Sequence, residues 1–139
     1  AGYGLGKGRR AIPTLEEQNI ALVEAFVDAW NRIDMTAVVD FLAPDVFYHN
    51  VPVEPIQGRD QVAAYLDQVG PFEAVDWRIL SIAAAGNKVL TERVDAFQLG
   101  DRRISLPLMG VFEIADGKIS QWRDYFDLGD YLRQTGQGD

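Results

Sequence analysis

Arg93, Asp95 and Asp124 are the residues whose types and spacing best suit acid-base chemistry in this sequence. Side chains alternate between the two faces of a β-strand, so Arg93 and Asp95, two positions apart, point the same way. The same rule places Asp124 on one face with Trp122 and Phe126. These faces are otherwise largely apolar, and a charge buried there is strongly destabilising unless it finds a partner. If the faces meet inside a curved sheet, Arg93 can pair with both carboxylates.

Two carboxylates bridged by an arginine can serve as an acid and a base when the site holds one proton between them. One carboxyl group then donates a proton while the other accepts one, and water that opens a strained ring needs both operations at once. Tyr48 and Asn50 share a face of an earlier strand, where their hydroxyl and amide groups can orient a water molecule against Asp124. The structural alternatives are solvated surface charges and a Tyr48 that caps the edge of the core. Polar groups from three separate strands on apolar faces favour the site.

Large apolar residues that can line a ligand cavity accompany these polar groups, although the same residue types more often build plain core. Leu106 and Leu108 are the best candidates, because residues 104–114 are apolar or glycine on that face without interruption. The candidates for binding an apolar substrate are Trp30, Val69, Phe72, Phe97, Leu106, Leu108, Trp122 and Phe126.

Composition removes several other kinds of chemistry. The chain has no cysteine and one histidine, His49, so thiolate catalysis, disulfides and an imidazole cluster are excluded, and neither a metal nor a cofactor is expected. His49 alternates away from Tyr48 and Asn50 and has no neighbouring ligand, which favours a structural or surface histidine. The formal net charge of -8 offers a nucleic acid or an anionic membrane no basic surface.

Length and hydropathy indicate one folded unit. With 139 residues, of which 47% are hydrophobic, the chain suits a single domain over residues 14–139. Residues 1–13 begin with alternating glycines and without methionine, which is typical of a flexible leader or a cloning remnant. No apolar stretch approaches the roughly 20 residues of a membrane helix, so a soluble, cytoplasmic protein without membrane partners is expected.

Helices are predicted ahead of most of the sheet. A capping-box pattern begins at Thr14, and apolar residues then recur at helical spacing, which predicts a first helix over residues 15–33. A short second helix is expected over residues 34–42, because an aspartate can cap its start and Pro44 stops it. A third helix is expected over residues 59–70, where a Gly-Pro pair ends it.

The remaining chain has the pattern of strands. A short strand is expected over residues 46–50, and glycine-containing pairs at 86–87, 100–101 and 116–117 are typical of hairpin turns. The strand-like runs on either side of these turns cover residues 74–84, 88–99, 103–114 and 118–126. Helices followed by a meander of strands indicate the α+β class.

Three segments of the chain carry a resemblance to a known family. They are Thr91-Glu92-Arg93-Val94-Asp95, Gly110-Val111-Phe112 and Trp122-Arg123-Asp124-Tyr125-Phe126-Asp127. Together with Tyr48-x-Asn50 and Gly58-Arg59-Asp60, they resemble the signature of the limonene-1,2-epoxide hydrolases, and the similarity extends from Leu15 to Leu128. The resemblance implies a fold similar to nuclear transport factor 2, ketosteroid isomerase and SnoaL-like proteins. In that fold a strongly curved mixed sheet forms a cone around a deep pocket, with three to four helices packed on it.

The resemblance also implies an activity, in which water is added to an apolar cyclic or linear epoxide to give a vicinal diol. The reaction takes one step and forms no covalent intermediate. Asp124 would be the general base, Asp95 the general acid, and Arg93 the bridge between the carboxylates, while Tyr48 and Asn50 hold the water. Trp122, in the same picture, packs beside the site as part of its wall. No cofactor is implied, and members of the family are commonly homodimers.

Two alternatives stay open on the same fold. The first is an enzyme of the ketosteroid-isomerase or polyketide-cyclase type, which needs one base and an oxyanion donor and leaves a bridging Arg93 unexplained. The second is a non-catalytic small-molecule-binding module, since a fold alone proves no activity. Burying three charges beside a pocket destabilises the folded protein, and a pocket that only binds a ligand does not need them. Their presence therefore favours an enzyme.

Overall fold

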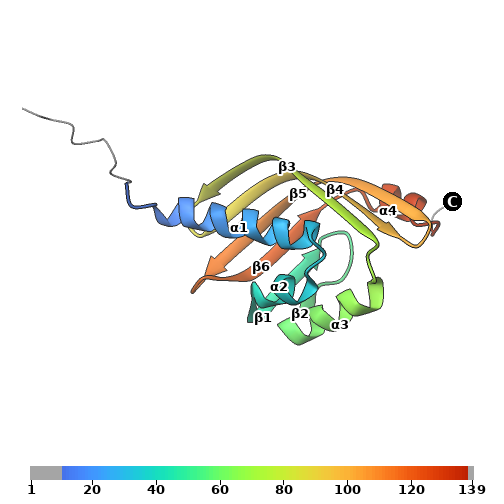
Figure 1. Cartoon of the computed structure of the whole chain (residues 1–139), viewed down its shortest axis with the longest axis horizontal. Coiled ribbons are helices and arrows are strands. Elements are labelled where there is room, and N and C mark those ends of the chain that lie inside the picture. The colour runs from blue at the N-terminus through green and yellow to red at the C-terminus, as the bar shows by residue number, and fades with distance from the viewer. Residues whose placement is uncertain (1–10, 138–139) are drawn as a thin grey trace, which may run out of the picture.

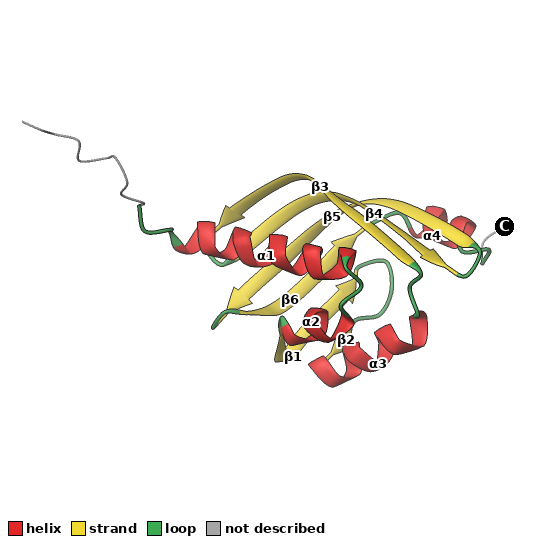
Figure 2. Ribbon diagram, viewed as in Figure 1, coloured by secondary structure: helices red, strands yellow, loops and turns green. Residues whose placement is uncertain are grey.

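One mixed sheet, with helices against its hollow side, makes up the described residues, 11–137 of a computed structural model (Figure 1 and Figure 2). The strands are β1 (Leu42–Asn50), β2 (Ile56–Gln57), β3 (Ala74–Ala85), β4 (Lys88–Leu99), β5 (Arg102–Ala115) and β6 (Lys118–Tyr125). The helices are α1 (Leu15–Asn31), α2 (Met35–Asp40), α3 (Arg59–Val69) and α4 (Leu128–Gln134). The α+β class predicted from the sequence is confirmed.

The six strands follow the order β2-β1-β6-β5-β4-β3. Strands β3 to β6 form an antiparallel meander, whereas β1 runs parallel to β6 and antiparallel to β2, which makes the sheet mixed. The hairpins turn at the predicted glycines, where Gly86, Gly100 and Gly117 have φ angles of 60°, 61° and 71°. Glycine adopts this left-handed region without strain, so these positions suit tight turns.

Helix α1 fills part of the hollow side of the sheet and leaves the rest for a cavity. Figure 1 shows the long strands β3, β4 and β5 arching over this helix. Phe26 of α1 packs edge-on against Phe112 of β5 at 5.7 Å and against Trp122 of β6 at 5.1 Å between ring centroids. All three residues belong to the central apolar cluster. Beyond the C-terminal end of α1, this helix no longer covers the hollow side of the sheet.

Two predicted helix ends were wrong. Helix α1 stops earlier than expected because Ile33 takes a positive φ of 54°. Helix α2 ends at Asp40, and Leu42 already begins β1, where it is fully buried and pairs with Ile119 of β6. Pro44 therefore lies inside a strand, at the point where the register of β1 against β6 shifts and no ladder hydrogen bond depends on its missing N–H.

Two short elements were missing from the sequence analysis. Strand β2 pairs with β1 over only two positions. Helix α4 is capped by Asp127, whose side chain accepts a hydrogen bond from the backbone of Asp130 at 3.1 Å, and Phe126 lies just beyond the end of β6. Residues 1–10 of the predicted leader lie outside the described residues. Within residues 11–137, none of the helices is both long and apolar enough to span a membrane.

Candidate active site

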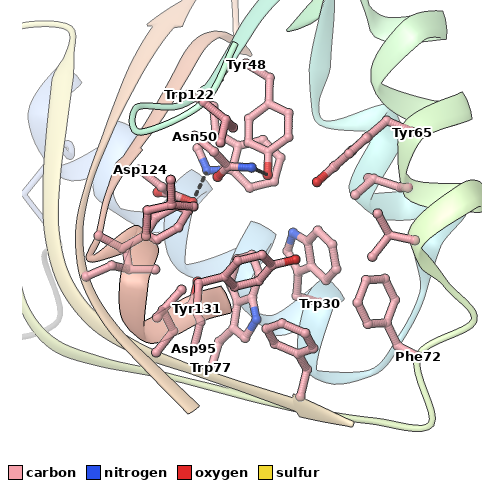
Figure 3. A pocket seen from close by; sticks show the side chains of 18 residues that line it. Trp30, Tyr48, Asn50, Tyr65, Phe72, Trp77, Asp95, Trp122, Asp124 and Tyr131 are labelled. Atoms are coloured by element: carbon pink, nitrogen blue, oxygen red, sulfur yellow. Dashed lines mark hydrogen bonds between the residues drawn. The ribbon is translucent and has the colours of Figure 1, made fainter. Parts of the chain in front are cut away.

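A mostly apolar cavity of about 200 Å³ opens between the hollow face of the sheet and the helices (Figure 3). Its polar wall is formed by Tyr48 and Asn50 of β1, Asp95 of β4 and Asp124 of β6. The residues predicted to bind an apolar substrate all line it, namely Trp30, Val69, Phe72, Phe97, Leu106, Leu108, Trp122 and Phe126. It is also lined by residues that were not predicted, namely Val53, Tyr65, Leu66, Trp77, Leu128 and Tyr131.

Arg93 holds the two carboxylates together at the wall of the cavity. Its Nε and Nη2 atoms donate to Asp95 Oδ1 at 3.1 Å and Oδ2 at 2.9 Å, and Nη2 also donates to Asp124 Oδ1 at 3.1 Å. Asp95 thus has a bidentate contact and Asp124 a single one. Arg93 is 0% exposed and each aspartate 4% exposed, so these charges lie in the interior. Their mutual pairing is what makes such burial tolerable.

The guanidinium of Arg93 is fixed on every side. It lies between two aromatic rings, with Cζ at 5.0 Å from the ring centroid of Trp77 and 5.4 Å from that of Phe112. Its Nη1 atom donates to the hydroxyl of Thr91 at 2.9 Å. Arg93 does not itself line the cavity, whereas both aspartates do. It therefore acts on the cavity through the carboxylates, as a positioning residue.

Gly110 of β5 provides the space in which this ion group forms. Strand β5 lies between β4 and β6, and Gly110 pairs with Thr91 on one side and Asp124 on the other. A Cβ atom added at Gly110 would lie 2.5 Å from Asp124 Oδ1 and closer still to Nη1 of Arg93. The backbone oxygen of Gly110 also accepts a hydrogen bond from Thr91 at 3.0 Å. Only a residue without a side chain lets the arginine reach across β5 to Asp124.

Trp122 lines the cavity and also contacts the carboxylate of Asp124. Its indole Nε1 donates to Asp124 Oδ2 at 3.1 Å, so each oxygen of Asp124 accepts one hydrogen bond from the protein. Alternation along the strand predicted Trp122 and Asp124 on the same face, and an indole N–H can only donate a hydrogen bond. That signal was sufficient to predict the contact, which fixes the plane of the carboxylate.

The two carboxyl groups hold protons more tightly than exposed ones do. Burial raises the pKa of Asp95 to about 6, and Arg93 opposes that rise. Burial also raises the pKa of Asp124, against the lowering effects of Arg93 and of the Trp122 hydrogen bond. The physical reason is that one arginine cannot neutralise two carboxylates, so the fully ionised group has a net negative charge in the interior. A single proton shared by the pair removes that charge.

Tyr48 and Asn50 meet the carboxylates through the parallel pairing of β1 with β6. In that register Tyr48 lies opposite Trp122, on which its ring stacks at 4.2 Å between centroids, and Asn50 lies opposite Asp124. Asn50 Nδ2 donates to the hydroxyl oxygen of Tyr48 at 2.9 Å. Burial, followed by the charge of Asp124, raises the pKa of Tyr48 well above its usual value, so its hydroxyl stays a neutral donor.

His49 points away from this group. Its Nε2 atom donates to the backbone oxygen of Val53 at 2.9 Å. In the described part of the chain, no group of three or more histidine, cysteine, aspartate or glutamate side chains is placed to hold a metal ion.

Some functional side chains were missed although the sequence contained a signal for them. Thr91 shares a strand face with Arg93 by simple alternation. Tyr65 precedes Val69 by four residues in a predicted helix, a spacing that puts both on one side. Tyr131, by contrast, belongs to α4, and without that helix the sequence offered no way to place it.

Comparisons with known proteins agree with this geometry. Residues 17–137 match the family described as the limonene-1,2-epoxide hydrolase catalytic domain. Epoxide hydrolase EphG of Mycobacterium tuberculosis is 39% identical over 116 residues, which cover 84% of this chain and 78% of that protein.

Solved structures show the same fold. The structure of an LEH-like epoxide hydrolase from M. tuberculosis is similar with a TM-score of 0.79 and 36% identity, covering 90% of this chain and 94% of that one. A Catenulispora acidiphila protein with a ketosteroid isomerase-like fold gives a TM-score of 0.71 at 23% identity, covering 83% of this chain and 92% of that one, and shows the shared fold alone. The fold and family predicted from the sequence are confirmed. The chain belongs to the limonene-1,2-epoxide hydrolase family.

Proposed function

We propose that this protein adds water to a small apolar epoxide, cyclic or linear, and releases a vicinal diol. The observation that carries the proposal is the buried group of Arg93, Asp95 and Asp124, whose two carboxylates face an otherwise apolar cavity. Two carboxyl groups on one arginine suit a reaction in which one proton is accepted and another donated in the same step. Membership of the epoxide hydrolase family supports the same reaction class.

In the proposed reaction Asp124 is the general base and Asp95 the general acid. Asp124 takes a proton from a water that Tyr48 and Asn50 orient, the water oxygen bonds to one epoxide carbon, and the bond from that carbon to the ring oxygen breaks. The ring oxygen takes the proton of Asp95 and becomes the second hydroxyl of the diol. One carboxyl group gains a proton as the other loses one, so the net charge around Arg93 stays constant. A proton then returns from Asp124 to Asp95 through solvent.

The position of the shared proton changes when substrate binds. In the free site the bidentate contact with Arg93 favours Asp95 as the ionised member of the pair. A carboxylic acid that donates to an epoxide oxygen gains a hydrogen bond that a carboxylate cannot make. Because the pair titrates as a unit, an epoxide oxygen beside Asp95 draws the proton to that residue. Substrate binding thereby places the proton on Asp95, the proposed general acid.

Isotope labelling tests the reaction. With the enzyme in molar excess over an epoxide in oxygen-18 water, direct attack by water places the label in the diol during the first turnover. Attack by a carboxylate would form an ester and give an unlabelled diol first, since its oxygen would come from the enzyme. An isomerase or cyclase of the same fold would shift a proton and form no diol, and a binding module would leave the epoxide intact. Absence of labelled diol across a varied panel of epoxides would contradict the proposal.

The pH dependence of hydrolysis follows from the shared proton. Burial raises the pKa of Asp95 to about 6 and also raises that of Asp124, so the pair keeps a proton to a higher pH than exposed carboxylates would and loses it as the pH rises further. We expect kcat/KM to fall on the alkaline side as the acid is lost, and on the acidic side as the base is protonated. Initial rates measured with a non-titrating epoxide give the profile. A flat profile between about pH 5 and pH 9 would rule out proton sharing.

We also propose that two copies of the chain associate through the outer face of the sheet. Leu90, Met109 and Tyr125, on three adjacent strands, are 39%, 48% and 46% exposed there, and Met109 pairs with Tyr125 in register. Neighbouring exposed apolar side chains of this kind mark interaction surfaces. Sedimentation velocity should give the mass of a dimer, and Met109→Glu should shift it toward that of a monomer. A monomeric wild-type protein at high concentration would refute this proposal.

A further inference from the structure

The indole N–H of Trp30 is a buried donor without a partner. Trp30 is 3% exposed, and within residues 11–137 no group accepts a hydrogen bond from its Nε1 atom. Its ring is held in place, stacked on Trp77 at 4.4 Å and edge-on to Phe72 at 5.4 Å between centroids. An unpaired buried donor is destabilising, and native proteins contain few of them. Such a donor in a cavity wall points to a ligand atom that completes the hydrogen bond.

The direction of this N–H fits a role in binding. Trp30 comes from α1 and lines the same cavity as the carboxylate of Asp124. Figure 3 shows the ring nitrogen of Trp30 directed into the cavity rather than into the surrounding core. None of the groups in the proposed reaction uses this atom, so it has no part in opening the epoxide. It is available to contact a part of the substrate other than the reacting ring.

Tyr65 of α3 supplies a second donor to the same cavity. Its ring centroid is 6.2 Å from that of Tyr48, and Figure 3 shows its hydroxyl pointing into the cavity. Burial, followed by the neighbouring Tyr131, raises the pKa of Tyr65, so the hydroxyl stays protonated at neutral pH. No described residue accepts a hydrogen bond from it. Two donors therefore face the cavity from α1 and α3, among the apolar side chains of Leu66, Val69 and Phe72.

The chemistry of these two donors defines the group they would hold. An indole N–H can only donate, so the ligand atom must be an acceptor. A carbonyl oxygen has two lone pairs and no hydrogen, so it can take both bonds and needs nothing in return. An anionic group is disfavoured, since it would be buried near a carboxylate pair that already exceeds the single positive charge of Arg93. A neutral carbonyl oxygen fits best.

We propose that this protein prefers apolar epoxides that have a carbonyl oxygen at the end remote from the epoxide ring, and that Trp30 and Tyr65 bind that oxygen. The inference rests on the proposed epoxide hydrolysis and adds the substrate class. A hydrocarbon epoxide would leave both donors without a partner or with a trapped water. A carbonyl-bearing epoxide satisfies them and is held with its ring at the carboxylates.

Matched substrates test this preference. Two cyclic epoxides that differ only in a remote ketone, replaced by a methylene group in the second, are compared by kcat/KM. We expect the wild-type protein to favour the ketone by about tenfold, equivalent to about 1.4 kcal/mol. Trp30→Phe keeps an aromatic ring and removes the N–H, so the ratio of kcat/KM for the ketone to kcat/KM for the hydrocarbon epoxide should drop to near unity, whatever change the smaller ring causes in the rate for both. Tyr65→Phe should remove part of the preference.

Phe72→Leu is the matched control, because it changes the cavity beside Trp30 without removing a donor. It should alter both substrates alike. Dissociation constants of the corresponding ketone and hydrocarbon without an epoxide, measured by calorimetry, give a readout independent of turnover. Only the ketone should bind more weakly to Trp30→Phe.

The outcomes separate this inference from the proposed function. Hydrolysis of both epoxides without preference in the wild-type protein, or an equal loss for both in Trp30→Phe, would overturn the inference and leave epoxide hydrolysis standing. Failure to hydrolyse either epoxide, together with ketone binding that depends on Trp30, would contradict the proposed reaction but support the carbonyl site. Ketone binding that is unchanged in both Trp30→Phe and Tyr65→Phe would overturn the site itself.

Discussion

Asp124→Asn lowers kcat for epoxide hydrolysis by about a hundredfold to ten-thousandfold, the range expected when a positioned general base is lost. Asparagine has the shape of aspartate and can still accept a hydrogen bond from Arg93, but it cannot take a proton from water. The lost interaction forms as the proton moves, so kcat and kcat/KM should fall together while substrate binding stays close to that of the wild type. Steady-state kinetics with a hydrolysed epoxide measures both.

Asp95→Asn should be impaired to a similar extent, because the ring oxygen then has no acid to protonate it. Asp76→Asn is a matched control, since Asp76 is an exposed aspartate on β3 of the same sheet. It should keep wild-type activity. A variant at position 95 or 124 that retained wild-type kcat would remove that residue from the mechanism.

Thermal unfolding shows whether these losses of activity reflect chemistry or misfolding. The folded-state pKa of Asp95, about 6, lies above the value of an unfolded aspartate, so the folded protein loses stability as the pH rises through that region. Replacing either carboxylate leaves one negative charge for Arg93, and the interior group is then neutral without a shared proton. Asp95→Asn and Asp124→Asn should therefore unfold at the wild-type temperature or above it at about pH 8.

The placement of Arg93 beside Asp95 could be predicted from the sequence because it depends only on local information. Alternation along a strand puts Arg93 and Asp95 on one face whatever the rest of the chain does. Burying them unpaired is so unfavourable that an apolar face containing charges predicts an ion group. Thr91, which accepts a hydrogen bond from Nη1 of Arg93, was not singled out as a site residue, because a threonine on a strand needs no explanation.

The arrangement between strands was beyond what such local rules can give. Asn50 meets Asp124 because β1 pairs in parallel with β6, and residues 51–117 separate those strands in the sequence. Because of the same pairing, Leu42 belongs to the sheet and not to the predicted helix. Gly110 is another example, because a side chain at this position is excluded only when Arg93 reaches across β5 to Asp124. Long-range pairing overrides local preference at these positions.

The cavity itself depended on helices whose placement the sequence did not give. Apolar residues such as Phe72 and Leu106 have the same pattern whether they fill a core or line a pocket. They line a cavity because residues of α1, α3 and α4 enclose this part of the sheet without filling it. Helix α4 has seven residues, one of them a glycine, and is too short to show a periodic apolar pattern in the sequence.

Arg93→Met lowers the free energy of unfolding by about 3–5 kcal/mol near neutral pH, the cost of breaking a buried ion pair on one side only. Such a loss is large beside the roughly 5–15 kcal/mol that stabilises an ordinary domain. Methionine fills the space between Trp77 and Phe112, so the loss comes mainly from two carboxylates left without a cation. Each of them can avoid burying a charge by binding a proton, which raises their pKa values further above those of the unfolded chain.

Because the carboxyl groups bind protons, the effect of Arg93→Met on the free energy of unfolding depends on pH. Below the unfolded pKa of the aspartates the carboxyl groups are neutral in both states, and the variant gains most relative to the wild-type protein, in which Arg93 is then without an anionic partner. As the pH rises through the elevated folded-state pKa values, the variant loses stability. Urea unfolding at about pH 5 and pH 8 should therefore show a larger difference from the wild type at the higher pH.

Two further variants make the Arg93 result decisive. Arg78→Met removes an arginine on β3 whose side chain is 67% exposed and should change stability by less than about 0.5 kcal/mol at either pH. Arg93→Lys keeps a positive charge but cannot hold Asp95 in a bidentate contact while reaching Asp124 and Thr91. It should recover part of the stability of Arg93→Met and little of the wild-type activity, since rate depends on the geometry of both carboxylates. If Arg93→Met were as stable as the wild type at about pH 8, or equally destabilised at both pH values, the carboxylates would not depend on Arg93 for their charge.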